Sequence, residues 1–259
     1  MKKRLWKTVC CTMTVIMLKC ASGCRSSTKS AQEENFALEE EADVNEDMSG
    51  NTNDGFRSAK KNLNDINVGD VYIFGSYEQD NNEANGKEDI EWQVLEKDGT
   101  KILVISKYAL DYQPYNTEWE AVTWETCSLR EWLNDEFINT AFSDEEKAMI
   151  PTVVVTADEN PYPNPYGDET DPGNDTQDQI FLLSIIEVEK YFDSDDAREC
   201  EVTASVRARD YYGWWLRSPG FGAVFASNID IIGRVDESGY NADNEALAVR
   251  PALWIDLEP

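Results

Sequence analysis

The order of strand-like and helix-like segments is the feature that most restricts the fold of this chain. Alternating apolar residues predict a first strand at 68–77 and a hairpin over 90–106. Helical patterns follow between residues 128 and 192, and strand patterns return over 214–255. A doubly wound sheet needs strands and helices in regular alternation. The sequence therefore predicts an α+β fold.

The helices are expected to be short. Residues 128–138 place apolar side chains on one helical stripe. Ser143 with Glu146 and Ser184 with Glu187 each have the spacing of a capping box, in which the two side chains satisfy free amides at a helix start. Between these helices lies a long Pro- and Asp-rich segment without periodicity, which predicts a functional or a mobile loop.

The amino terminus has the pattern of an export signal. Residues 1–7 form a basic segment without acidic residues, and an apolar run of ten residues follows at 9–18. That run is too short to span a bilayer and has the length typical of a signal peptide. The sequence A21-S-G-C24 before a polar tract resembles the lipobox of bacterial lipoproteins, which implies that Cys24 becomes the acylated first residue. An ordinary secretory signal with an incidental Cys24 is the alternative.

Composition divides the rest of the chain into two parts. Residues 24–66 are polar and acidic, with too few apolar residues to offset chain entropy, so we expect a disordered tether. Residues 67–259 carry the strand and helix patterns and are expected to form a single domain. The predicted organisation is therefore a lipoprotein signal peptide at 1–23, the tether and this domain.

The domain retains two cysteines, Cys127 and Cys200. In an exported protein this pair can form a disulfide, since oxidising compartments preserve such bonds. Two separate buried thiols are the alternative.

Two features of composition exclude whole classes of function. The chain has no histidine, which removes Ser-His-Asp and Cys-His nucleophile systems and most catalytic zinc sites. Its 51 acidic and 23 basic residues give a formal charge of −28, which repels nucleic acid and anionic lipid headgroups. Carboxylate chemistry of the glycosidase type stays open.

A Trp-Trp segment offers candidate ligand-binding residues. If Y212-G-W-W-L-R217 is a strand, Trp215 and Arg217 share one face. An indole beside a guanidinium can stack on a sugar ring and bind its hydroxyls, and Tyr211 lies just before. The same pair can instead be a Trp–Arg stack within the core.

Several motifs resemble those of a known group of proteins. They are W124-E-T-C-S-L-R-E-W-L-N134, D171-P-G-N174, W214-W-L-R-S-P-G220 and A248-V-R-P-A-L-W-I255. Together they resemble an uncharacterised family of surface domains from exported proteins of Gram-positive bacteria, over about residues 66–257. The closing pattern also resembles the C-type lectin-like fold, shared by lectins and the formylglycine-generating enzyme. This implies mixed antiparallel sheets with two or three short helices and long loops.

The long loop also holds candidate metal ligands. Asp171, Asn174, Asp175 and Asp178 lie close together in sequence, and such oxygen ligands suit Ca²⁺. A solvated acidic loop without metal is the alternative.

The expected function is that of a lipid-anchored extracellular binding module. Its ligand would be a glycan or a protein, reached through the loop at 160–178 and exposed aromatic residues. The protein would lie on the outer face of the cytoplasmic membrane, contact that membrane only through its anchor, and bind no nucleic acid. An exported carboxylate-based hydrolase and a structural spacer are the alternatives.

Overall fold

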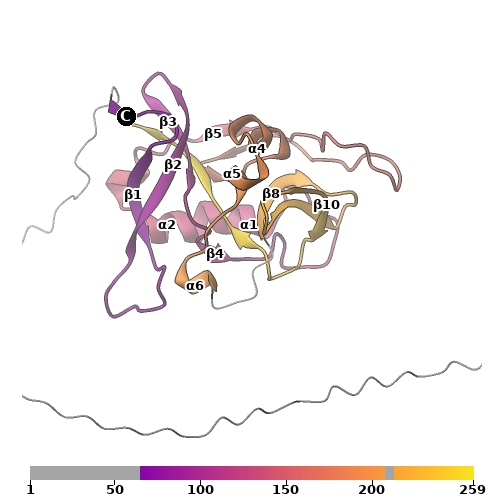
Figure 1. The fold of residues 1–259 in the computed structure, drawn as a ribbon, viewed down its shortest axis with the longest axis horizontal. Helices are drawn as coiled ribbons and strands as arrows, with labels where there is room; N and C mark the ends of the chain where they lie inside the picture. The colour runs from indigo at the N-terminus through magenta and orange to yellow at the C-terminus, as the bar shows by residue number, and fades with distance from the viewer. Residues whose placement is uncertain (1–64, 208–212) are drawn as a thin grey trace, which may run out of the picture. The chain divides into compact units, whose positions relative to one another are not determined.

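The computed structural model of the protein describes residues 65–207 and 213–259. These residues form two five-stranded sheets, a two-stranded ribbon and several short helices, so the α+β prediction is confirmed (Figure 1). The strands are β1 (Val71–Tyr77), β2 (Glu88–Asp98), β3 (Lys101–Ser106), β4 (Asp111–Tyr112), β5 (Val153–Val155), β6 (Thr176–Asp178), β7 (Ile180–Phe181), β8 (Gly213–Pro219), β9 (Phe225–Asp230), β10 (Val235–Asn241), β11 (Ala248–Val249) and β12 (Ala252–Asp256). The helical elements are α1 (Ser128–Trp132), η2 (Leu133–Phe137), α2 (Ile138–Ala141), α3 (Asp144–Lys147), α4 (Ile185–Tyr191), α5 (Asp195–Arg198) and α6 (Ala204–Arg207).

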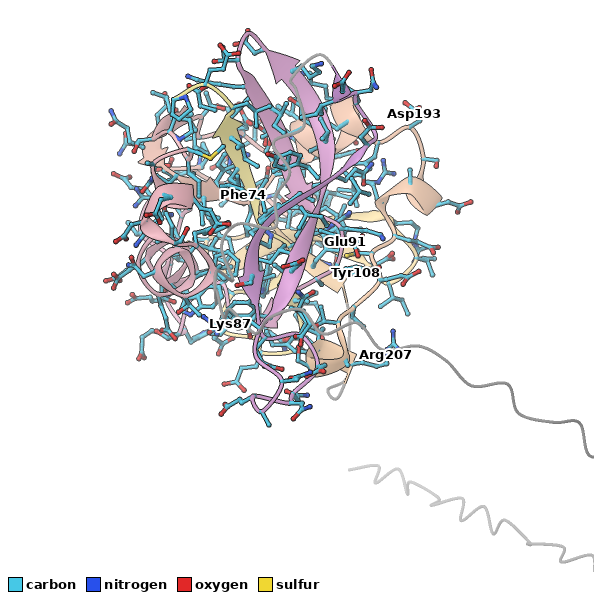
Figure 2. The ribbon with its side chains drawn as sticks, turned by 90° about the vertical axis from the view of Figure 1, so that its left-hand side faces the viewer. Phe74, Lys87, Glu91, Tyr108, Asp193 and Arg207 are labelled. Carbon is cyan, nitrogen blue, oxygen red and sulfur yellow. The ribbon has the colours of Figure 1, made fainter. Side chains whose placement is uncertain are left out.

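The first sheet has the order β1-β2-β3-β12-β7, and all its neighbours are antiparallel. The predicted hairpin joins β2 to β3, with Asp98 opposite Lys101. Gly99 lies in the two-residue turn at φ 58°, a conformation that glycine adopts without steric cost. Figure 2 shows β1 and β2 along one side of the molecule, with Phe74 of β1 and Glu91 of β2 labelled.

The second sheet has the order β10-β9-β8-β11-β4. Its neighbours are antiparallel except β8 and β11, which pair in parallel through Trp214 and Ala248. The seven residues of β8 are all buried, so other parts of the molecule cover both of its faces.

The carboxyl-terminal segment joins the two sheets. It contributes β11 to the second sheet and β12 to the first, and Pro251 lies between the two strands. Proline cannot donate to a ladder, which agrees with the break in pairing at this point. Arg250 is buried there: its Nε donates to the Ser106 carbonyl at 2.9 Å, and its guanidinium lies 4.9 Å from the ring of Trp214.

The helical predictions are confirmed in their main features. Residues 128–141 form one helical segment, although a π-helical stretch, η2, interrupts it. The predicted apolar stripe faces the core, since Leu129, Leu133 and Phe137 are buried. Both capping boxes form, at Ser143 and at Ser184.

The core extends slightly beyond the expected domain boundary. Ile66 is buried and belongs to the main hydrophobic cluster, although the sequence placed it in the tether. The predicted signal peptide, Cys24 and the rest of the tether up to residue 64 lie outside the described residues. Within the described part of the chain, no helix has the length and apolar character needed to cross a membrane.

Candidate ligand-binding face

Three loops meet beside the second sheet and form a surface that we call the loop face. It comprises residues 117–126, 156–175 and 220–225. The first and third loops are joined by a hydrogen bond of 2.8 Å from the Val122 amide to the Ala223 carbonyl. The second loop contacts the first at Gly173, which has φ +85° and where a Cβ atom would lie 2.7 Å from Thr123 Oγ1. Only glycine therefore fits this close contact without displacement.

Two asparagines attach the long loop to the second sheet. The amide of Asn160 donates to the carbonyls of Pro219 and Glu237, at 2.9 and 2.8 Å. The amide of Asn164 donates to the Phe221 carbonyl at 3.2 Å and, within the loop, to the Asp168 carbonyl. These bonds give the loop defined positions against β8 and β10, beyond which it projects in Figure 1.

The same two asparagines also position two tyrosines. The side-chain oxygens of Asn160 and Asn164 accept the amides of Tyr162 and Tyr166, at 3.0 and 2.9 Å. Each Asn-Pro-Tyr unit is thus an Asx turn with a tyrosine at its end. Tyr162 is 37% exposed and Tyr166 is 84% exposed.

Contacts at the edges of the rings orient these aromatic side chains. Tyr166 lies edge-on to Phe221 with centroids 6.3 Å apart, and Trp119 lies edge-on to Phe225 at 6.2 Å. Trp119 is 55% exposed. Tyr162 donates its hydroxyl to Glu189, and this hydrogen bond raises the pKa of the phenol to about 12. The rings therefore present large apolar surface to solvent in defined orientations.

A cavity of about 440 Å³ lies between the first and second loops. Its lining includes two carboxylates, three hydroxyls, an amide and small apolar residues. The lining residues are Ala121, Val122, Thr123, Glu125, Thr126, Thr170, Asp171, Gly173, Asn174 and Ala223. This volume is within the range of pockets that hold small ligands.

Arg217 lies beneath the long loop rather than on its surface. Its side chain is 2% exposed and forms ion pairs with Glu187 and, at 2.9 Å, with Asp158. It also donates to the carbonyls of Thr156 and Leu182. Arg217 therefore fixes the start of the loop. The prediction that Arg217 contacts ligand is corrected, because its side chain is buried.

The same correction applies to Trp215. Its ring is fully buried, its indole N–H donates to the Gln113 carbonyl at 2.9 Å, and it packs on Tyr115. Other parts of the molecule cover the face of β8 that carries Trp215. The ring therefore has no exposed surface on which a sugar could stack. Tyr211, the third predicted ligand-binding residue, lies outside the described residues.

The four predicted metal ligands have separate partners. Asp178 is buried and binds Trp124 Nε1 at 3.0 Å and Arg130 Nε at 2.6 Å. Asp171 accepts the amide of Gly173, and Asp175 accepts the amide of Ala157. Asn174 donates to Glu125. Their hydrogen bonds shape the loop, and Asp178 in particular is committed to Arg130.

Within residues 65–207 and 213–259, the carboxylates close enough to share a cation are those of Glu78, Asp80 and Glu88. Their oxygens already accept backbone amides, among them those of Gln79 and Asn82. This group lies on the β1–β2 connection, apart in sequence from the predicted calcium loop.

The structure contains Cys127 and Cys200 as free thiols, so the predicted disulfide is not formed. Cys127 is buried at the start of α1, where its sulfur accepts the Arg130 amide. Burial raises the pKa of the Cys127 thiol to about 12 and also raises the pKa of Cys200. The alternative of two separate thiols agrees with this arrangement.

A second cavity, of about 330 Å³, lies near the ends of β1 and β4. Tyr77 donates its hydroxyl to Asp111 at this cavity. Burial raises the pKa of the Tyr77 phenol most, and the negative charge of Asp111 raises it further. Glu78, Asn81 and Ser205 also belong to the polar part of the lining.

Sequence reasoning missed the tyrosines and Trp119. A signal was present, because N160-P-Y-P-N-P-Y166 contains Asn-Pro-Tyr twice, four residues apart. Asparagine before such a turn and an aromatic residue at its end predict a fixed, displayed side chain. Trp119 has no comparable local signal, since its edge contact is with Phe225, which is far away in the sequence at the start of β9.

Comparison with known proteins gives a family and no further relative. No curated protein and no solved structure matches the chain. One family model matches residues 99–257, which include the predicted motifs from Trp124 to Ile255. This match spans more than half of the chain and begins at the turn between β2 and β3. The chain therefore belongs to the family described as Domain of unknown function (DUF6273).

Proposed function

We propose that this protein is an extracellular binding module and that its loop face holds a glycan or protein ligand. The observation that carries the proposal is the pair of Asn-Pro-Tyr turns, which hold Tyr162 and Tyr166 outward on a loop fastened to the second sheet. Exposed rings in fixed positions bind with little loss of conformational entropy.

The construction beneath the loop supports the same proposal. Arg217 is buried among two carboxylates and two carbonyls, and it joins Thr156 and Asp158 at the start of the loop to Leu182 and Glu187. Sites that recognise ligands need such support, because loosely held side chains lose affinity on ordering.

We further propose that the domain has the C-type lectin-like fold. Two largely antiparallel sheets, several short helices and long loops are compatible with the C-type lectin-like fold implied by the sequence motifs. In this proposal the loop face takes the place of a lectin's binding loops, without the calcium motifs of sugar-binding lectins.

The proposed location is the outer face of the cytoplasmic membrane, through acylation of Cys24. We expect the full chain, expressed in a Gram-positive host, to partition into detergent and Cys24→Ala to be released into the medium. Equal partitioning of the two proteins would exclude the lipid anchor.

The binding proposal is tested on glycan and peptide arrays with the exported protein. We expect selective binding that Trp119→Ala and Tyr166→Ala each reduce by about tenfold, because a buried aromatic anchor contributes more than 1 kcal/mol. Ile231→Ala is the control, since Ile231 is 57% exposed, close to the 55% of Trp119, but directly follows the far end of β9. Binding that all three variants retain would rule out the loop face.

A further inference from the structure

The loop face has a one-sided charge. Its three segments contain no lysine or arginine. The acidic residues are Glu118, Glu120 and Glu125 in the first segment and Asp158, Glu159, Asp168, Glu169, Asp171 and Asp175 in the second. A concave surface lined by one sign of charge favours ligands of the opposite sign.

The two carboxylates of the 440 Å³ cavity have neutral partners. Glu125 accepts the backbone and side-chain N–H groups of Asn174, and Asp171 accepts the amide of Gly173. The neighbouring cation, Arg130, directs its guanidinium to Asp178 and to the carbonyls of Glu125 and Gln177. Among the described residues, Arg130 forms its salt bridge with Asp178, and neither Glu125 nor Asp171 has a cationic partner.

The remaining lining specifies what kind of cation fits. Thr123, Thr126 and Thr170 contribute hydroxyls and Asn174 an amide, while the apolar part consists of two alanines and Val122. A lysine could pair with the carboxylates, but its alkyl chain offers no hydrogen bond to these hydroxyls and this amide, which can form further bonds besides those within the lining. A polyhydroxylated ring would satisfy them.

Trp119 belongs to the same loop as the cavity and is exposed. An indole ring stacks on the apolar face of a sugar and attracts ammonium groups through its π-electrons. Its edge contact with Phe225 holds it in place for both interactions.

We infer that the cavity binds an amino sugar with a free amine, whose ammonium group lies between Glu125 and Asp171. This inference rests on the proposed binding function and narrows it to one ligand class. The sugar hydroxyls bind the threonines and Asn174, and the next sugar of a chain lies against Trp119.

The test is calorimetric titration of the exported protein at mildly acidic pH and about 0.15 M salt, where charges beyond about 8 Å are screened. The probes are a β-1,4-linked glucosamine hexamer, the corresponding N-acetylglucosamine hexamer and hexalysine. We expect the glucosamine hexamer to bind at least about tenfold more tightly than either of the others, because only it offers both the charge and the hydroxyls.

Two variants locate the binding. Glu125→Gln and Asp171→Asn keep an oxygen for the Asn174 and Gly173 amides, so both should fold, as the melting temperature will verify. Each should weaken binding of the glucosamine hexamer by about tenfold through loss of a charge-assisted hydrogen bond. Glu145→Gln, on the exposed surface of α3, is the control: it removes the same charge elsewhere and should bind as the parent does.

The possible outcomes separate this inference from the binding proposal. Equal binding of the acetylated hexamer, lost in Trp119→Ala, would overturn the ammonium inference and leave the loop face as a glycan site. Tighter binding of hexalysine would assign the face to basic peptides and also overturn it. No binding, or equal loss in Glu145→Gln, would show that the cavity is not an amino-sugar site.

Discussion

Arg217 is the residue on which the geometry of the loop face depends most. Its guanidinium is buried with Asp158 from the loop and Glu187 from the capping box of α4. The buried guanidinium and its two carboxylate partners depend on one another. If Arg217 is removed, each carboxylate is left without a compensating charge in a poorly solvated environment.

We expect Arg217→Met to lower the free energy of unfolding by about 3–5 kcal/mol, the cost of breaking a buried ion pair. Urea unfolding measures the change. Arg234→Met is the matched control, since Arg234 forms an ion pair with Asp230 but its side chain is 63% exposed. Such a surface pair contributes about 0–1 kcal/mol. Equal losses in the two variants would contradict the supporting role of Arg217.

The two cysteines of the domain are unpaired and differ in exposure. We expect the non-reduced protein to carry free thiols at Cys127 and Cys200, because the structure gives each its own partners. Alkylation of the folded protein should modify the partly exposed Cys200 before the buried Cys127, and denaturation should make both reactive. Peptide mapping by mass spectrometry reads both sites. A 127–200 disulfide peptide would contradict the structure.

Residue burial was only partly predictable from the sequence. The strand pattern placed Trp215 and Arg217 on one face but did not decide between an exposed pair and a pair within the core. Alternation assigns residues to the two faces of a strand, but it does not tell which faces are covered. In this protein both faces of β8 are covered.

At the scale of elements, the long loop acts as a defined structure because each Asn-Pro-Tyr turn has its own anchor. Asn160 joins the loop to β8 and β10, and Asn164 joins it to Phe221. The two turns are therefore expected to open independently.

Hydrogen exchange tests this independence. Asn164→Ala removes the acceptor of the Tyr166 amide and should speed exchange there by about tenfold, in line with loss of one hydrogen bond. The Tyr162 amide should keep its protection. Asn160→Ala should give the reverse pattern, so each variant is the control of the other. Faster exchange across residues 156–175 in both would show that the loop opens as one unit.

Elements with local signals were the ones predicted well. The β2–β3 hairpin and both capping boxes depend on residues within a few positions of one another, and all three form. The π-helical stretch η2 and the anchors of the long loop had no such signal. The anchors depend on contacts between segments far apart in the chain, such as that of Asn160 with Glu237.

At the scale of the whole molecule, the carboxyl-terminal segment unites the described domain. It gives β11 to one sheet and β12 to the other, with Arg250 buried between them. The strand pattern of residues 247–255 suggested one strand that lies at an edge or has a bulge at Pro251, whereas the two halves enter different sheets. The second sheet, to which the long loop is attached, is thus connected to the first sheet through this segment.

The ligand is proposed to bind at the loop face and not at the second cavity beside Tyr77. Amide chemical-shift mapping with the tightest ligand from the arrays distinguishes the two sites. We predict that the shifted resonances concentrate in residues 117–126, 156–175 and 220–225, with Trp119 Nε1 among them. Shifts gathered instead at Tyr77, Asp111 and Ser205 would contradict the account.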